Sequence, residues 1–358
     1  MNIMTMGACT DDGIVFFLPS MEVNGLFMVD LSKDNQAVFI GDFPDCKREN
    51  AWQIVKAFYY DGNVYFFSHY SFEMWIMNKQ ERILKHYTYL DENTGFIDIV
   101  IPINNKVWVV SRSPLEILCL DLSTKKVEKI HWDTKSELRN NVCTASSVWK
   151  NRIYLCTRLE ADVYMGVIDC SKNSVAFYRL NELFIAKNIT AGNDRVFVSG
   201  ISCDGNFVLL EYDLERISLL TCHHLKTIKM NKNTGIDYRE MVVQNKKILF
   251  LPGTIGEFMI YDINDVSERQ MEGLEMPALM GQTLYFLDIQ RIGSTMYLFP
   301  GAFNKLVKLN LDTLHSDVIK VEANKKEYCK LVSKKTEQIY RETVNVNLDW
   351  FLSWVGRK

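Results

Sequence analysis

The sequence lacks the segments that place a protein in a membrane or on nucleic acid. It has no uninterrupted run of about 18 apolar residues, the length that a membrane-spanning helix needs. Its start, MNIMTMGACTDDG, has neither the basic region nor the apolar stretch of a secretory signal. Lys and Arg (41) nearly balance Asp and Glu (44), and no basic block stands out. We therefore expect a soluble protein without nucleic-acid or membrane partners.

Familiar catalytic and metal-binding motifs are also missing. The nine cysteines never occur as C-x-x-C and mostly lie inside apolar runs, where a free thiol behaves as a small hydrophobe. Only six histidines are present, and the cluster Cys222-His223-His224 would point to alternating faces of a strand. There is no glycine-rich phosphate loop and no G-x-S-x-G elbow. We expect a reduced, cytoplasmic protein without a metal or cofactor.

What the chain does contain is an internal repeat. The apolar run KVWVV, which starts at Lys106, has counterparts spaced 43 to 52 residues apart. They start at Gly13, Asn63, Arg152, Arg195, Lys247 and Thr295. Fifteen to eighteen residues after each start, a second run ends at an acidic or amide residue: Asp30, Asn78, Asp121, Asp169, Asp213, Asp262 and Asn310. Because these two markers occur together seven times at a similar spacing, they indicate seven copies of one unit.

Each unit is predicted to hold four antiparallel strands. The runs are rich in β-branched and aromatic residues. The turns before the first marker, such as Asp61-Gly62 and Asn193-Asp194, tolerate the positive φ that tight hairpins require. A further run precedes each turn, and another follows each Asp or Asn. Four strands in 40 to 50 residues, repeated seven times, predict an all-β fold: a seven-bladed β-propeller of four-stranded antiparallel blades.

The repeat also sets expected boundaries and a core. We assign residues 1–321 to the propeller, with blade 1 starting near Asn2, blade 7 ending near Val321 and little strand exchange at ring closure. Radial stacking would cover both faces of every blade. Aromatic residues at near-equivalent strand positions are expected to pack between blades: Phe16, Tyr65, Trp108, Tyr154, Phe197 and Tyr297.

The third strand and its turn resemble a known repeat. The stretches VDLSK (29–33), LDLSTKK (120–126), IDCSKN (168–173) and YDINDV (261–266) are similar to the third strand of Kelch-type propellers. The Gly-Gly doublet of Kelch repeats is absent, and the single Trp132-Asp133 pair does not recur as in WD40 repeats. The resemblance therefore implies the propeller superfamily, loosely Kelch-like, and no narrower family.

Candidate binding residues lie in loops that this topology brings to one end of the channel. Loops between second and third strands, and links between blades, emerge on the same face, where function usually resides. A cationic, aromatic-lined pocket for a protein, peptide or small anionic ligand is expected there. Its candidate residues are His69, Tyr70, Arg112, Arg158, Arg139, Arg239, Trp52, Tyr238 and Glu22.

Two alternatives stay open at this point. Each Arg could instead pair with a neighbouring loop acid, such as Glu22, Glu160, Asp162 or Glu240, and merely lock the loops. The protein could also be an enzyme, a lyase or hydrolase acting on a carbohydrate or cyclic peptide, with His69 and Glu22 or Asp98 as acid and base. Because the catalytic signals are thin, we favour a binding or scaffold protein over an enzyme.

The repeat does not explain the C-terminal residues. We assign residues 322–358 to an extension that begins with a polar, solvated connection (322–336). In NLDWFLSWVGRK, Leu348, Phe351, Leu352 and Val355 recur at helical spacing, which predicts a short amphipathic helix near 347–356. Such a helix must pack on the propeller or on a partner.

Overall fold

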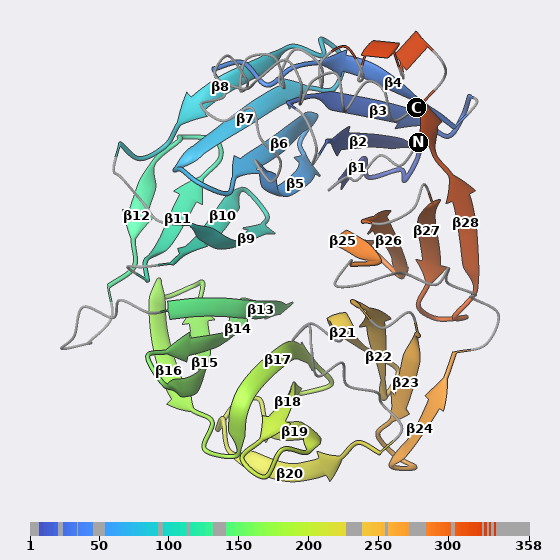
Figure 1. Ribbon diagram of the computed structural model, residues 1–358. Coiled ribbons are helices and arrows are strands. Elements are labelled where there is room, and N and C mark those ends of the chain that lie inside the picture. Colours follow the sequence, from blue (N-terminus) through green and yellow to red (C-terminus); the bar gives the residue numbers. More distant parts are fainter. Residues whose placement is uncertain are drawn as a thin grey trace, which may run out of the picture.

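The described strands form seven sheets around a central channel. The computed structural model describes residues 7–20, 24–33, 35–45, 54–91, 96–112, 115–131, 141–226, 238–254, 257–271, 284–301, 305–323, 326–327, 329–330 and 333. Six sheets have four strands and one has five, and they follow one another around a ring (Figure 1). Neighbouring strands within each blade are antiparallel. The predicted seven-bladed β-propeller is confirmed.

In each blade the chain runs from the channel outward. The innermost strands are β1 (Ala8–Cys9), β5 (Ile54–Tyr60), β9 (Ile97–Ile103), β13 (Asn141–Trp149), β17 (Leu183–Gly192), β21 (Tyr238–Gln244) and β25 (Phe286–Ile292). The second strands are β2 (Val15–Pro19), β6 (Asn63–Ser68), β10 (Lys106–Ser111), β14 (Arg152–Leu159), β18 (Arg195–Ser202), β22 (Lys247–Pro252) and β26 (Thr295–Pro300). The third strands are β3 (Leu26–Asp30), β7 (Glu73–Asn78), β11 (Ile117–Asp121), β15 (Asp162–Asp169), β19 (Phe207–Asp213), β23 (Met259–Asp262) and β27 (Lys305–Asn310). The outermost strands are β4 (Gln36–Gly41), β8 (Leu84–Thr88), β12 (Val127–Lys129), β16 (Ser174–Arg179), β20 (Leu219–His224), β24 (Ser267–Gln270) and β28 (Ser316–Lys320).

The recurring Asp or Asn ends every third strand because its side chain builds the next turn. In all seven blades its Oδ1 accepts a hydrogen bond from the backbone N–H two residues later, at 2.9 to 3.1 Å. Asp and Asn have the short acceptor that such a turn needs. The marker that revealed the repeat is therefore a local structural device.

The hairpins also follow the predicted turn chemistry. Asp61 and Gly62 have φ values of 46° and 75°, and Asn193 and Asp194 have 52° and 58°. These left-handed conformations match the right-handed twist of the flanking strands.

The core lies between blades. Seven apolar clusters are present, each built mainly from two neighbouring blades. The aromatic residues predicted to pack there are at most 5% exposed. Phe16 and Tyr297, for example, meet edge to face across the boundary between blades 1 and 7, with ring centroids 5.3 Å apart. The predicted inter-blade packing is confirmed.

Six of the seven innermost strands carry a β-bulge at an equivalent position, which the sequence analysis did not predict. The extra residues in blades 2 to 7 are Val55, Asp98, Thr144, Lys187, Arg239 and Leu287. A bulge bends its strand and can redirect side chains. In this ring the bulges leave polar side chains and backbone groups beside the channel that are not paired within their own sheet.

Those freed groups bond from one blade to the next. The contacts are His69 Nδ1 to Ile97 O (2.8 Å), Cys143 N to Asp98 Oδ2 (2.9 Å), Thr144 Oγ1 to Ala186 O (3.4 Å), Asn188 Nδ2 to Tyr238 O (3.1 Å), Arg239 Nη2 to Leu287 O (2.8 Å) and Lys56 Nζ to Asp288 Oδ1 (2.6 Å). Together they connect blades 2, 3, 4, 5, 6 and 7 and return to blade 2. We call this set the bulge circuit.

The bulge circuit bypasses blade 1, whose innermost strand β1 has only two residues. Blade 7 instead reaches blade 2 directly, through the ion pair of Lys56 with Asp288 and through Gln290 Nε2, which donates to Ala57 O. Gln290 also fixes β1, because its Oε1 accepts the N–H of Cys9 at 3.1 Å. Polar side chains thus hold β1 against blade 7.

Every blade takes its four strands from one continuous stretch of chain, and a short segment after blade 7 adds a fifth strand to blade 1. Strand β29 (Glu322–Ala323) pairs in parallel with β4 as a fifth strand (Figure 1). Lys326, Glu327, Cys329, Lys330 and Ser333 are helical. Lys326, Cys329 and Ser333 are exposed, whereas Glu327 is buried. The buried carboxylate of Glu327 accepts the N–H of Phe39 at 2.6 Å. An exposed strand edge has unpaired groups that need such cover. The helix predicted near 347–356 lies outside the described residues.

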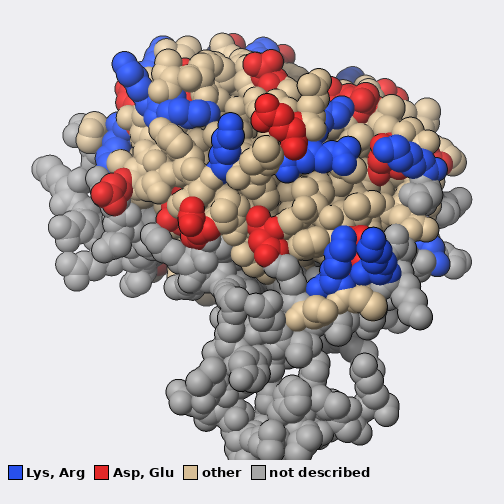
Figure 2. Space-filling model, turned by 90° about the horizontal axis from the view of Figure 1, so that it is seen from above, with Lys and Arg blue, Asp and Glu red and all other residues tan. Residues whose placement is uncertain are grey.

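The rim over blades 1 and 2 carries charges of both signs. Figure 2 shows Lys and Arg interspersed with Asp and Glu on this face, without a continuous field of one sign. Among the residues with described structure, no helix is long and apolar enough to cross a membrane.

Replacing Asp169 by Ala should destabilise the fold through its turn. Asp169 Oδ1 accepts hydrogen bonds from Ser171 N (3.1 Å) and Ser171 Oγ (2.6 Å). We expect a loss of about 1 kcal/mol in urea unfolding at pH 7. Asp169→Asn, which keeps the acceptor, should lose less. The Ser171 hydrogen bond lowers the pKa of Asp169 in the folded protein. The ionised Asp169 therefore stabilises the fold at pH values above its ordinary pKa of 3.8, and this stabilisation is lost as the pH falls below 3.8. Equal losses for Ala and Asn would contradict the turn assignment.

Replacing Lys56 by Met should weaken ring closure. The side chain of Asp288 is 5% exposed, and losing its cation leaves a buried carboxylate unpaired, at a cost of about 3 to 5 kcal/mol. Lys56→Met with Asp288→Leu should recover much of this loss. Lys85→Met, on the exposed face of β8, serves as the control. Chemical denaturation measures the free energy of unfolding of Lys56→Met, of the double variant and of Lys85→Met. A double variant as unstable as Lys56→Met would refute the pairing.

Candidate functional site at the channel mouth

Four side chains from blades 2 and 3 gather at one end of the channel. His69 and Tyr70 follow β6, Phe96 precedes β9, and Arg112 follows β10. The ring centroids of His69, Tyr70 and Phe96 lie 4.9 to 5.4 Å apart. The guanidinium carbon of Arg112 lies 5.7 Å from the Phe96 centroid, within cation–π range. We call these four residues the mouth cluster.

Backbone hydrogen bonds hold the mouth cluster in place. Arg112 N donates to Phe96 O at 2.6 Å, and Ile97 N donates to His69 O at 2.9 Å. His69 Nδ1 lies 2.8 Å from Ile97 O, so this nitrogen carries the proton and Nε2 is left as an acceptor. Burial lowers the pKa of His69, which keeps the imidazole neutral near pH 7. The segments on either side of the boundary between blades 2 and 3 are thus fixed together.

Arg112 is anchored by Asp98. Its Nε and Nη2 lie 2.9 and 2.5 Å from Asp98 Oδ1, and the Asp98 side chain is 2% exposed. The second Asp98 oxygen is the one that accepts the N–H of Cys143. An acid does therefore pair with Arg112, but it is none of the four that the sequence suggested. The side chain of Arg112 stays 37% exposed and can still contact a ligand.

The structure separates the other predicted site residues. Arg158 is exposed within β14 and forms no ion pair with a described residue. Tyr238 is 3% exposed and packs on Phe250, so the exposure expected for it was wrong. Arg239 faces the channel, away from the mouth cluster. The remaining candidates lie outside the described residues: Trp52, Arg139 and Glu22.

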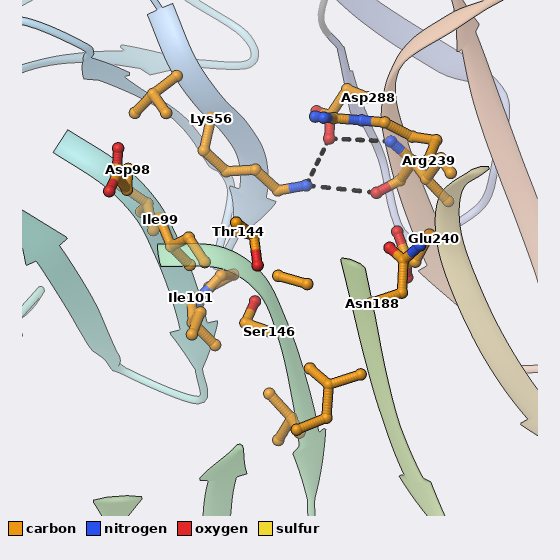
Figure 3. A pocket seen from close by; sticks show the side chains of 17 residues that line it. Lys56, Asp98, Ile99, Ile101, Thr144, Ser146, Asn188, Arg239, Glu240 and Asp288 are labelled. Carbon is orange, nitrogen blue, oxygen red and sulfur yellow. Dashed lines mark hydrogen bonds and ion pairs between the residues drawn. The ribbon is translucent and has the colours of Figure 1, made fainter. Parts of the chain in front are cut away.

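A cavity of about 320 Å³ occupies the channel below the mouth cluster. All six bulged innermost strands contribute to its wall, and Asp98 belongs both to this wall and to the anchor of Arg112. Its polar lining is Lys56, Asp98, Thr144, Ser146, Asn188, Arg239, Glu240 and Asp288, seen in Figure 3. Ile99, Ile101, Ile189 and Ile289 supply apolar walls. We call this space the channel cavity.

Burial changes the ionisation of Glu240, which lines this cavity. It raises the pKa of the Glu240 carboxyl to about 7, although Lys56 and Arg239 nearby act to lower the pKa. The carboxyl is thus protonated about half the time near neutral pH. By contrast, Lys56 and Asp288 form a close ion pair (Figure 3).

A second cavity of about 410 Å³ lies beside blade 1. Cys9, Tyr59, Tyr60, Gln290 and Arg291 are among its lining residues. Lys56 lines this cavity as well as the channel cavity. The Lys56–Asp288 ion pair therefore stands between the two spaces.

Phe96 and several polar members of the channel cavity, namely Lys56, Thr144, Ser146, Asn188 and Asp288, were not predicted from the sequence. Lys56, Asn188, Glu240 and Asp288 each follow the bulged residue of their strand. Aligning the innermost strands would have shown polar residues recurring at this position, although apolar residues are expected in a central strand. No group of His, Cys, Asp and Glu in the described ranges could hold a metal ion.

Glu240→Gln should change how stability depends on pH. Because the folded pKa of about 7 exceeds the ordinary 4.5 of Glu, the folded state binds the proton more tightly than the unfolded chain. The wild-type free energy of unfolding should fall as the pH rises from about 4.5 to 7. Glu240→Gln should therefore be more stable than the wild type at pH 8, by about 3 kcal/mol, and similar at pH 4.5. Urea titrations at both pH values, with the exposed Glu81→Gln as control, check this; identical pH profiles would contradict it.

Comparison with known proteins supports the fold and does not indicate a function. No protein-family model matches the chain, and no curated protein matches it. Solved structures do resemble it. The Dos1 propeller has a TM-score of 0.57 and 10% identity, over 90% of this chain and 86% of that one. A chain of the mitotic checkpoint complex has a TM-score of 0.55 and 8% identity, over 89% and 87%. The WD40 domain of Neurospora crassa Pan2 has a TM-score of 0.52 and 8% identity, over 83% and 85%. The chain is thus similar to propellers of known structure, and its fold is that of a seven-bladed β-propeller.

Proposed function

We propose that this protein is an interaction module that binds a segment of another protein at the mouth cluster. The observation that carries the proposal is the ring of Phe96, which is 43% exposed. His69, Tyr70 and Arg112 surround it. Aromatic and arginine side chains supply most of the binding energy in protein interfaces.

The rigidity of the mouth cluster supports the same function. Backbone bonds tie its segments together, and Asp98 fixes the direction of Arg112. A surface that is ordered before binding loses little entropy when a partner arrives. Because Asp98 neutralises Arg112, the cluster favours mixed aromatic and polar contacts over capture of a free anion.

Other features agree with a protein-binding role in the cytoplasm. The eight cysteines within the described ranges are all free, as expected in a reducing compartment. An acid–base role has less support: Asp98 is held by Arg112 and by Cys143 N, and His69 Nδ1 is held by Ile97 O. Neither group is poised to exchange a proton with the other.

Selection of a random peptide library on the immobilised protein tests this proposal. The enriched peptides should bind the wild type. Phe96→Ala should weaken their affinity at least tenfold, since truncating a hot-spot aromatic costs about 2 kcal/mol. Fluorescence anisotropy with labelled peptides measures the affinities.

Tyr178→Ala provides a matched control. The exposed fraction of Tyr178 is 39%, similar to that of Phe96, but Tyr178 lies on the outer strand β16. Its removal should leave the affinity unchanged. The proposal fails if no peptide is enriched, or if Phe96→Ala binds the selected peptides as tightly as the wild type does.

A further inference from the structure

We propose that the channel cavity binds a small hydroxylated carboxylate, with Arg239 as the group that holds the carboxylate. This site is separate from the mouth cluster, and the proposal does not depend on the binding of a protein there. It rests on the shape of the cavity, on the balance of its charges and on its neutral polar lining.

The cavity has the size of a small-molecule site. Ligand pockets usually measure about 300 to 1,000 Å³, and this cavity of about 320 Å³ lies at the lower end of that range. Strands from six blades enclose it, and isoleucine side chains form part of its wall. A folded segment of protein would not fit, whereas a compact metabolite would.

The charges of the cavity leave one cation unbalanced. Lys56 is paired with Asp288 at 2.6 Å, and Asp98 is paired with Arg112 at 2.5 Å. Arg239 forms no ion pair with a carboxylate of a described residue. Its Nη2 donates to Leu287 O at 2.8 Å, which orients the guanidinium and leaves its other N–H groups available. A planar fork of N–H donors suits a carboxylate.

Arg239 is directed to the cavity by the bulge of its own strand. It is the extra residue of β21, between Tyr238 and Glu240 in the register. Successive residues of a regular strand point to opposite faces, but a bulge can redirect a side chain. Arg239 and Glu240 both line the cavity as a result.

Glu240 makes the net charge of the cavity depend on pH. With the Glu240 carboxyl neutral, Arg239 leaves one net positive charge; with it ionised, the charges cancel. The charged groups that act on Glu240 are Lys56 from β5, Arg239 from its own strand, and Asp288 and Arg291 from β25. Strand β17 presents the uncharged Asn188 to the same cavity. Burial outweighs the cations, so Glu240 loses its proton near pH 7, and an anion should bind better below that pH.

The neutral lining selects for hydroxyl groups beside the carboxylate. Thr144, Ser146 and Asn188 line the cavity (Figure 3). A protonated Glu240 can donate one hydrogen bond and accept others. These groups match a ligand that carries both donors and acceptors, such as a short hydroxy acid or a sugar acid.

Titration calorimetry with sodium gluconate and sodium lactate tests the site. Both probes are fully ionised at pH 6 and pH 8, and sorbitol provides the same carbon skeleton as gluconate without the carboxylate. A carboxyl with a pKa of about 7 is mostly protonated at pH 6 and mostly ionised at pH 8. If the protonated form binds, the apparent Kd should be about tenfold weaker at pH 8. Sorbitol should not bind measurably.

Three variants separate the roles of the residues. Arg239→Gln should weaken gluconate or lactate binding at least tenfold at pH 6. Glu240→Gln should bind with the same Kd at both pH values, because its side chain cannot ionise. Arg179→Gln, which removes an arginine on the outer strand β16, should bind as the wild type does.

Each alternative outcome overturns part or all of the proposal. If neither probe binds at either pH, or if Arg239→Gln binds as tightly as the wild type, the carboxylate site is refuted. A tenfold pH dependence that persists in Glu240→Gln refutes its link to Glu240. Circular dichroism and thermal melting of each variant show that the fold is intact. Loss of peptide binding in Phe96→Ala is a separate result and does not bear on this site.

Discussion

The propeller depends on bonds that pass between blades at the level of the bulges. A four-stranded blade cannot cover both of its faces, so the apolar clusters supply most of the favourable burial. Apolar burial has no direction, however, and does not by itself fix how one blade is rotated against the next. Hydrogen bonds that involve the side chains of Asp98, Thr144, Asn188 and Arg239 provide that direction, because each joins a defined atom of the following blade. The bulges exist where these side chains must turn toward a neighbour.

The β-bulges that fix the orientation of neighbouring blades also make the channel polar. A bulge leaves a residue unpaired in the ladder, and in this ring it falls six times at one height around the channel. Side chains next to the bulges therefore form a belt that combines structural bonds with groups able to meet a ligand. Asp98 illustrates both roles, since it joins blade 3 to blade 4, anchors Arg112 of the mouth cluster and lines the channel cavity. Stability and recognition are consequently hard to separate at this level of the structure.

The sequence predicted the features that repeat within a blade and missed those that depend on contacts between blades. The Asp or Asn at the end of each third strand and the turns with positive φ are local, so seven copies made them visible. His69, Tyr70 and Arg112 were placed near one another for the same reason, because the loops of adjacent blades share a face. Tyr238 was predicted to line the mouth pocket, but its ring packs on Phe250 in the apolar cluster between blades 5 and 6. Phe96 has no counterpart in the repeat, and Lys56 and Asp288 are 232 residues apart, so only the closed ring brings them together.

That separation has a consequence for the order in which the protein is made. During synthesis the N-terminal part of a chain leaves the ribosome first, and domains begin to fold as they emerge. Lys56 becomes available early, whereas its partner Asp288 follows only after six blades have been translated. Closing so long a loop must await nearly the whole chain, and contacts of high sequence separation form slowly. The channel cavity is therefore completed last, and a nascent chain has no finished pocket until the ring has closed.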